Sequence, residues 1–555
     1  MALNGADWLA QSLAVSGQTH VFFVDAVLRK TLLALRDAGV QPVLAHTEKA
    51  AVYMADGHAR ISGRPGVVAA QSVGAANLAA GLQDAYLGRA PVVALTGRKV
   101  PAHQHRNAYQ EVDHKPLFAP VTKLSNDVAE ASDLPRALRQ AFAAATALPP
   151  RPVHLDLFGL QAEVIEAGMV DAVPADLSAF RVMAQRPQPE ARAIAAAAAA
   201  LLAAPKVAII AGDAAAASGA GEALLAVAEA LHAPIGTALG ARNIIDTRHP
   251  LHIGVVGAYA GPAANQVLAE ADLILFVGAD TGDMLTNYWR TPKAGTPIIQ
   301  IDADPAEFEH SFPAAVAVQA DPRDGLLALA AALGKPARDG AYLHRAQVRM
   351  AAWRREWAER RTQPGIAIDP ADLARAITAA LPEDGILVAD TGYSGIWTGN
   401  CVEMTPRQTY LRAAGSLGWS FPAALGAKLA APDCKVICWS GDGAFYYHLA
   451  ELETARRRGI AVVLVVNNNS GFGQGWPNFL RNSGNRPDAA AEMLRFGPTD
   501  FTAVARSFGL TGIRVERPEE LGPALEMALA NKETVVVDVV TDIDARAPAP
   551  WTPEG

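Results

Sequence analysis

Cysteine is scarce in this chain. Only three occur in 555 residues, Cys401, Cys434 and Cys438, and their spacing forms no metal-binding pattern. Low cysteine usage is typical of a reducing compartment, so we expect a cytoplasmic protein. We predict that Cys434 and Cys438 act as small hydrophobic residues in or beside one strand.

An excess of basic charge is also missing. The chain has 48 Lys and Arg against 56 Asp and Glu, and a formal net charge of −8. No basic patch interleaved with aromatic residues is present, so we expect neither nucleic acid nor an anionic membrane as a partner. The longest apolar run, residues 193–204, is mostly alanine and too short to span a bilayer. Residues 1–17 lack the basic start and cleavage site of a signal peptide, and we predict an amphipathic helix there.

Hydrophobic residues, in contrast, make up 51% of the chain, which supports several cores. The length suggests about three domains. Strand-like and helix-like patterns alternate throughout, as in doubly wound parallel sheets. Prolines between 174 and 190 indicate a linker, and residues 335–370 are charged and predicted to be helical. We therefore predict an α/β fold with three doubly wound parallel-sheet domains, at residues 1–175, 190–340 and 365–545.

Polar side chains follow two apolar runs in the third block. Residues 436–439 lead into Ser440-Gly441-Asp442-Gly443, and residues 461–466 lead into three successive asparagines. The carboxyl ends of neighbouring parallel strands lie side by side, so Asp442 and an asparagine are expected to converge. Carboxylate and amide oxygens suit Mg²⁺, which usually shares phosphate ligands with a substrate.

The turn itself favours the same interpretation. Gly441 and Gly443 allow the backbone to approach a diphosphate, and a helix expected to start near Ala444 would offer free N–H groups. The alternative is an ordinary strand–turn–helix with an aspartate cap. The three asparagines at a suitable distance favour the cation site.

The pattern Gly-Asp-Gly, a spacer of residues 444–467, and Asn468-Asn469 resembles the thiamin-diphosphate-binding signature. This resemblance implies Asp442, Asn469 and the carbonyl of Gly471 as Mg²⁺ ligands. The triple asparagine leaves Asn468 as an alternative ligand.

Glu48 stands at the start of a predicted helix, where a carboxylate also complements the helix dipole. It precedes Gly57 of an Ala-Asp-Gly-His-Ala-Arg run by nine residues, with His58 where the family usually has an aromatic residue. The resemblance implies that Glu48 bonds the pyrimidine ring of the cofactor and promotes loss of the proton at thiazolium C2.

Residues 71–77 resemble the strand end and Gly-Ala-x-Asn turn of the family, and residues 108–111 and 120–123 resemble elements of its acetolactate synthase branch. Leu417 matches a bulky residue that bends the cofactor, although a core leucine is the alternative. The resemblance implies catalytic roles for Glu48, Tyr109 and Gln110, and places Gln474 where it would face the reacting carbon, so a catalytic role is expected for it as well. It implies cofactor contacts at Asn77, Gly392, Tyr393, Ser394, Gly415, Leu417, Gly441, Gly443, Ala444 and Phe472.

Three departures from that branch concern specificity. The loop with Asp25 is not rich in Gly and Pro, and Gln474 replaces a hydrophobic residue. In the central block, Gly278-Ala279-Asp280 lacks the arginine of flavin-binding members, so FAD is not expected. Residues 441–448 are also similar to enzymes that cleave cyclic diketones.

The resemblance implies Mg²⁺- and thiamin-diphosphate-dependent cleavage or formation of a C–C bond next to a carbonyl. We expect a polar 2-oxo acid, aldehyde or acyloin substrate. The likeness also implies a homodimer or homotetramer, with Glu48 from one chain facing Asp442 of another. Alternatives are an acyloin or diketone C–C lyase or hydrolase, and a regulatory protein that binds the cofactor without turnover. A nicotinamide dehydrogenase is disfavoured, because no Gly-x-Gly-x-x-Gly follows the first strand.

Overall fold

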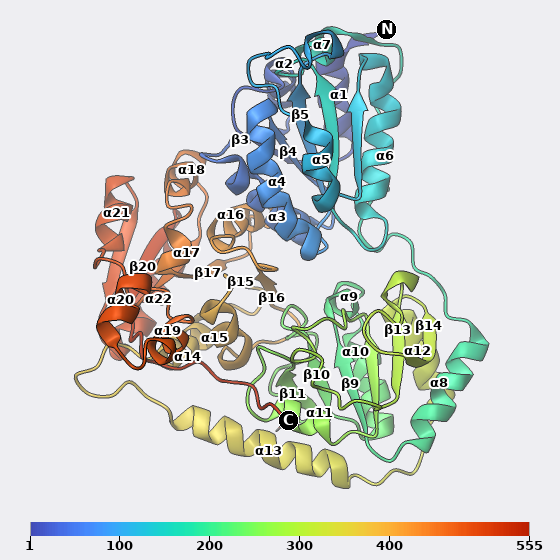
Figure 1. Ribbon diagram of the computed structural model, residues 1–555, viewed down its shortest axis with the longest axis vertical. Helices are drawn as coiled ribbons and strands as arrows, with labels where there is room; N and C mark the ends of the chain where they lie inside the picture. Colours follow the sequence, from blue (N-terminus) through green and yellow to red (C-terminus); the bar gives the residue numbers. More distant parts are fainter. Residues whose placement is uncertain (1, 554–555) are drawn as a thin grey trace.

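The computed structural model describes residues 2–553 and contains three six-stranded parallel sheets flanked by helices (Figure 1). The α/β fold predicted from the alternating pattern is therefore confirmed. Each sheet comes from one stretch of chain. Strands buried on both faces need continuous apolar sequence, and Val207–Ala211 is buried at every position.

The first sheet has the strand order β3-β2-β4-β5-β7-β6. Its strands are β2 (His20–Phe23), β3 (Gln41–Leu44), β4 (Gly66–Ala70), β5 (Val92–Arg98), β6 (Leu124–Val128) and β7 (Val153–Phe158). The helices around it are α1 (Gly5–Val15), α2 (Arg29–Asp37), α3 (Glu48–Ser62), α4 (Ser72–Leu87), α5 (His114–Phe118), α6 (Leu134–Thr146) and α7 (Glu163–Ala167). A small antiparallel pair, β1 (Leu3–Asn4) and β8 (Met169–Val170), lies beside it.

The third sheet repeats this topology, with the order β16-β15-β17-β18-β20-β19. Its strands are β15 (Ile386–Ala389), β16 (Thr409–Arg412), β17 (Val436–Gly441), β18 (Val463–Asn468), β19 (Thr511–Val515) and β20 (Val535–Val540). Its helices are α14 (Pro370–Ala380), α15 (Tyr393–Cys401), α16 (Ser420–Ala430), α17 (Asp442–Phe445), α18 (Glu451–Arg458), α19 (Trp476–Asn482), α20 (Pro487–Leu494), α21 (Phe501–Ser507) and α22 (Leu521–Ala530).

The central sheet differs, with the order β11-β10-β9-β12-β13-β14 typical of dinucleotide-binding folds. Its strands are β9 (Val207–Ala211), β10 (Ile235–Thr237), β11 (His252–Val255), β12 (Leu273–Val277), β13 (Ile298–Asp302) and β14 (Ala314–Gln319). Its helices are α8 (Ala191–Ala203), α9 (Asp213–Ala217), α10 (Gly221–Leu231), α11 (Ala264–Ala269), α12 (Pro322–Leu333) and the connecting α13 (Ala341–Glu359).

Helices α3 and α16 join the first and third sheets (Figure 1). A Cβ on Gly57 would lie 2.1 Å from the carbonyl oxygen of Ala423, and one on Gly426 would lie 1.9 Å from that of Met54. Only glycine permits such an approach of two helix backbones. The two helices consequently hold both sheets in one fixed arrangement within the chain.

A helix starts near Ala444 as expected, since α17 begins at Asp442. It ends after four residues, however, and the next helix, α18, begins only at Glu451. The Asp442 side chain accepts the N–H of Gly443, so that group is not free for a ligand. Cys438 lies in β17 and Cys434 just before it, as predicted, and all three thiols are free. Within residues 2–553, no helix combines the length and apolarity needed to cross a membrane.

Candidate active site

The ends of β17 and β18 bring Asp442 and the segment 469–471 together. The two strands pair in parallel, with Gly441 opposite Asn467. One Asp442 carboxylate oxygen accepts the backbone N–H of Gly471 at 3.1 Å, and the other accepts that of Gly443 at 2.7 Å. Burial raises the pKa of Asp442 to about 6, against the lowering effect of these backbone donors.

The structure distinguishes the neighbouring asparagines. Asn468 is buried and donates to the carbonyl of Thr499 at 3.0 Å and to Asp538 at 2.8 Å. Asn469 Oδ1 is buried and has no hydrogen-bond partner among the described residues. A buried amide oxygen without a donor is costly, and a cation would satisfy it. The donor set therefore fits Mg²⁺ at Asn469, whereas Asn468 has a structural role.

The two glycines of the turn have different surroundings. A Cβ on Gly441 would meet only Ser394 Oγ, at 3.9 Å, and a Cβ on Gly415 would meet nothing within 4 Å. A Cβ on Gly443 would lie 2.5 Å from the Phe472 ring. Gly441 and Gly415 thus leave open space for a ligand, whereas Gly443 is required for packing against Phe472.

Leu417 lies between two carboxylates that the sequence did not single out as anchors. Asp84 of α4 accepts the backbone N–H groups of Ala414, Gly415 and Ser416 at 2.7–3.0 Å. Asp390, at the end of β15, accepts those of Gly418 at 3.0 Å and Ser420 at 2.9 Å. Leu417 itself is half-buried and belongs to none of the hydrophobic cores found in residues 2–553. This position disfavours a core leucine.

Glu48 begins α3, as predicted, and its carboxylate lies against the first turn of α4. Asn77 Nδ2 donates to Glu48 Oε2 at 3.0 Å. A Cβ on Gly74 would lie 2.6 Å from Glu48 Oε1, so a larger residue there would displace the Glu48 carboxylate. The preceding loop is fixed to the third sheet's helices, because Glu451 accepts the backbone N–H of His46 at 2.9 Å.

Tyr109, Gln110 and Gln474 lie on two loops. Gln110 adopts a left-handed conformation with φ of 58°, and its carbonyl accepts the Ser72 hydroxyl. Tyr109 next to it is 74% exposed. Gln474 is exposed, but its side chain reaches the Gly392 turn, because a Cβ built on Gly392 would lie 2.8 Å from Gln474 Oε1. Tyr393 and Ala444 are half-buried and buried respectively, beside the same strand ends.

A separate cleft opens at the point where the central strand order reverses, between β9 and β12. A cavity of about 340 Å³ there is lined by Asp213, Asp280 and Asp283, with Arg89 and Arg412 from the other two sheets' elements. Arg89 already pairs with Glu307 at 2.7 Å. The cleft has the position of a dinucleotide site but carries several carboxylates.

Comparison with known proteins places these features in a family. Residues 3–117, 194–329 and 390–539 match the N-terminal TPP binding, central and C-terminal TPP binding domains of thiamine pyrophosphate enzymes. The chain is 30% identical to a probable acetolactate synthase large subunit of Methanocaldococcus jannaschii, over 100% of this chain and 94% of the relative.

Two further relatives cover the chain almost fully. Acetolactate synthase isozyme 2 large subunit of Escherichia coli is 29% identical over 97% of this chain and 96% of its own. A probable 2-ketoarginine decarboxylase of Pseudomonas aeruginosa is 32% identical over 94% and 90% respectively. These matches, the repeated fold of the outer domains and the polar strand ends agree with one another. The chain belongs to the thiamine pyrophosphate enzymes, and it is similar in sequence to acetolactate synthases.

Proposed function

We propose that this enzyme uses thiamin diphosphate and Mg²⁺ to break or form a C–C bond next to the carbonyl of a 2-oxo acid. The observation that carries the proposal is the buried Asn469 Oδ1, which has no hydrogen-bond partner among residues 2–553. The backbone N–H of Asn469 lies against the Asp442 carboxylate. These groups lie at the strand ends of a domain that matches the C-terminal TPP binding domain.

Each part of the site has a separate task in this proposal. Asp442, Asn469 and the Gly471 carbonyl would hold Mg²⁺, and residues around Gly441 and Gly415 would accommodate the diphosphate. Thiamin diphosphate, when bound, supplies the carbon nucleophile at its thiazolium C2. Glu48 would exchange a proton with the pyrimidine, and Leu417 would fix the angle between the two rings.

The site is proposed to be shared between two chains. Residues beside Glu48 and Gln110 leave apolar surface uncovered in a single chain: Val73 is 41% exposed and Tyr109 74%. Tyr447, which follows the Gly-Asp-Gly turn, is 52% exposed. Exposed apolar residues on the loops of an active site are expected where a second chain covers them. We infer a homodimer or homotetramer in which Glu48 of one chain meets the Mg²⁺ site of another.

The substrate is inferred to be a polar 2-oxo acid. The names of the relatives describe acetolactate synthesis and decarboxylation of 2-ketoarginine, and the latter substrate is itself a polar 2-oxo acid. Gln474 offers an amide near the Gly392 turn, where it can bond a substrate oxygen. The three free thiols are consistent with action in the cytoplasm.

The test is a turnover screen of the protein loaded with thiamin diphosphate and Mg²⁺. Aliphatic, polar and charged 2-oxo acids are assayed for CO₂ release, and acyloins and cyclic diketones for cleavage. We expect turnover of at least one polar 2-oxo acid, which Asp442→Ala abolishes. Turnover of acyloins or diketones alone would identify a C–C lyase or hydrolase. Tight cofactor binding without turnover of any compound would identify a regulatory protein.

A further inference from the structure

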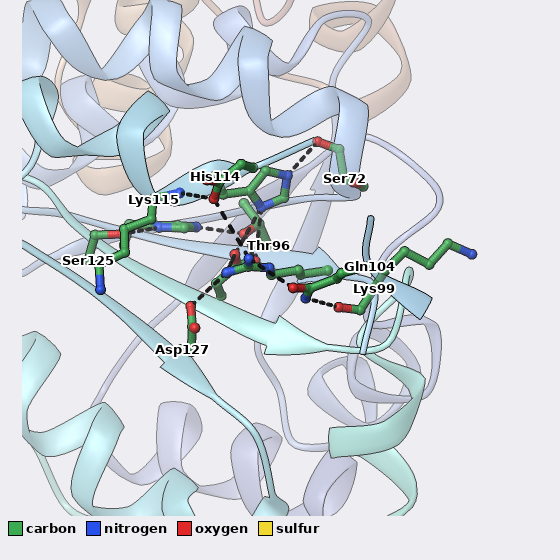
Figure 2. A network of polar contacts seen from close by, with 12 residues as sticks. Ser72, Thr96, Lys99, Gln104, His114, Lys115, Ser125 and Asp127 are labelled. Atoms are coloured by element: carbon green, nitrogen blue, oxygen red, sulfur yellow. Dashed lines mark hydrogen bonds and ion pairs between the residues drawn. The ribbon is translucent and has the colours of Figure 1, made fainter. Parts of the chain in front are cut away.

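A buried histidine in the first domain, His114, has hydrogen-bond acceptors at both ring nitrogens (Figure 2). Nδ1 lies 3.0 and 3.1 Å from the two carboxylate oxygens of Asp156, and Nε2 lies 3.0 Å from the carbonyl oxygen of Ser72. The ring is fully buried and Asp156 is 2% exposed. A carboxylate and a carbonyl can only accept, so both ring nitrogens must carry hydrogen for both bonds to form.

The neighbouring His154 shows the opposite pattern. Its two nitrogens face hydroxyls, Thr96 Oγ1 at 2.6 Å and Ser125 Oγ at 2.8 Å. Thr96 donates its own hydrogen to Asp156, so His154 Nε2 donates to Thr96 and Nδ1 accepts from Ser125. Burial lowers the pKa of His154 well below its usual value, in agreement with a neutral ring. Of the two histidines in the network, therefore, only His114 is positively charged and paired with the Asp156 carboxylate.

A metal ion is the alternative occupant, because ligand atoms of His114, His154 and Asp156 lie within 4.8 Å of one another. Every one of these atoms that a metal would use already has a hydrogen-bond partner in the network. Arg98 Nη1 also lies 3.6 Å from Asp156 and adds positive charge. The ion pair accounts for the geometry without a metal.

The network reaches the residues assigned to the cofactor through Ser72. This residue begins α4, so its backbone is continuous with the turn that contacts Glu48 through Gly74 and Asn77. Its hydroxyl donates to the carbonyl of Gln110 and holds that residue at a positive φ. A non-glycine residue in this conformation is retained only when its surroundings fix it.

We propose that His114 is an imidazolium that, paired with Asp156, positions the Ser72 turn and the Gln110 loop against the cofactor site. The inference deepens the proposed function and rests on it for its catalytic consequence. It makes His114 and Asp156 positioning residues, since neither is assigned a contact with cofactor or substrate.

The protonation state is tested by NMR on protein labelled with ¹⁵N-histidine and prepared with and without EDTA. We expect two protected N–H signals from one imidazole, both lost in His114→Asn and one lost in Asp156→Asn. EDTA should change neither. A single N–H signal from His114, or signals that depend on chelator, would overturn the ion pair.

The positioning role is tested by hydrogen–deuterium exchange of peptides covering 71–77 and 104–112. We expect faster exchange in both segments for His114→Asn, and in 104–112 for Ser72→Ala, which keeps the ion pair intact. His252→Asn is the matched control, because His252 is a buried histidine of the central domain. Unchanged exchange in both test variants would refute the positioning role. If one variant fails to fold, unchanged exchange in the other variant would refute it as well.

Kinetics complete the test on whichever 2-oxo acid is turned over. Both test variants should lower kcat about 10- to 100-fold, as expected for misplaced reacting groups, with KM changed less than about threefold. A lower Tm with unchanged kcat would show that the His114–Asp156 network only stabilises the fold. If the wild type turns over no 2-oxo acid, the proposed function fails, whereas the NMR and exchange results still decide the role of His114.

Discussion

Asn77 Nδ2 donates a hydrogen bond of 3.0 Å to Glu48 Oε2, across the junction of α4 and α3. One carboxylate oxygen of Glu48 is thereby held, while Gly74 leaves room for the other. The pair shows how a helix-start glutamate, which the dipole alone would explain, is fixed in one orientation.

Replacing Glu48 by Gln should slow deuterium exchange at C2 of bound thiamin diphosphate by about 100-fold, the lower range for loss of an acid–base group. Cofactor affinity should stay within a small factor, because the side-chain shape is kept. Asn77→Ala should slow exchange less, since it removes only the orienting bond. Exchange by Glu48→Gln at the wild-type rate would remove this residue from the proton path.

The asparagine ambiguity yields a paired prediction. Asn469→Ala and Asp442→Ala should weaken Mg²⁺-dependent cofactor binding about tenfold or more, with little change in Tm for Asn469→Ala. Asn468→Ala should instead lower the free energy of unfolding by about 1–3 kcal/mol, because Asp538 and Thr499 lose a buried donor. Titration calorimetry with and without Mg²⁺, and thermal melts, separate the two. If Asn468→Ala folds normally but its cofactor binding no longer depends on Mg²⁺, then Asn468, not Asn469, is the metal ligand.

Local sequence was sufficient to predict the sheet class, the start of α3 and the meeting of Asp442 with the 469–471 loop. These features depend on apolar periodicity and on the geometry of parallel strands. Edge strands such as β14 and β19 were not predicted, because they are short and partly exposed, and their pattern is weak.

The supporting carboxylates could not be predicted for a different reason. Asp84 lies in a helix 330 residues before the segment whose N–H groups it accepts, and no local pattern indicates such a contact. His114 and Asp156 are likewise joined only by the fold. The early end of the helix expected near Ala444 was also missed. After Phe445 the backbone bonds run from Tyr447 to Ala444 and from His448 to Phe445, which are turn bonds that no sequence pattern here indicates.

The purified protein should be colourless. Asp280 stands where flavin-binding members carry an arginine, and it lines the central cleft together with Asp213 and Asp283. Carboxylates at this position repel the diphosphate of FAD. Absorbance between 350 and 500 nm, before and after incubation with FAD, is the measurement. A flavin band that co-purifies with the protein would contradict the prediction.

Stability should fall as pH drops below about 6.5. Burial is the main cause that lowers the pKa of His58 and of His252 to about 3, so both are neutral in the folded state at pH 4.5. The unfolded chain binds these protons near pH 6.5, so stability is complete above that pH and is lost progressively toward pH 3. Each of the two histidines should lower the free energy of unfolding at pH 4.5 by about 2–3 kcal/mol relative to its value above pH 6.5. Thermal melts from pH 7.5 to 4.5 should show that Tm declines less steeply in the double variant His58→Gln/His252→Gln than in the wild type. Parallel declines of Tm in the two proteins would exclude these histidines as the cause of the pH dependence.

Gln474 should direct the enzyme away from acetolactate synthesis. Its amide oxygen lies near the Gly392 turn. Trp476, in contrast, is buried in a small apolar cluster with Leu494 and Ile543, and its indole N–H bonds Asp544 at 2.8 Å. Asp25 is engaged in an exposed ion pair with Arg29 at 3.0 Å, so we assign the polarity of the site to Gln474. A site built for a hydrogen bond rejects partners that lack it by orders of magnitude.

The wild type is therefore expected to produce little acetolactate from pyruvate, and Gln474→Met is expected to raise that activity about tenfold or more while lowering turnover of a polar 2-oxo acid. Gln474→Glu is the matched variant, since it keeps size and an acceptor oxygen but removes the amide donor. Acetolactate is measured colorimetrically, and CO₂ release is measured for the polar substrate. Vigorous acetolactate production by the wild type, at the same rate in Gln474→Met, would show that this side chain does not determine specificity. Substrate choice would then depend on other residues of the pocket, such as the half-buried Leu417 and the exposed Tyr109.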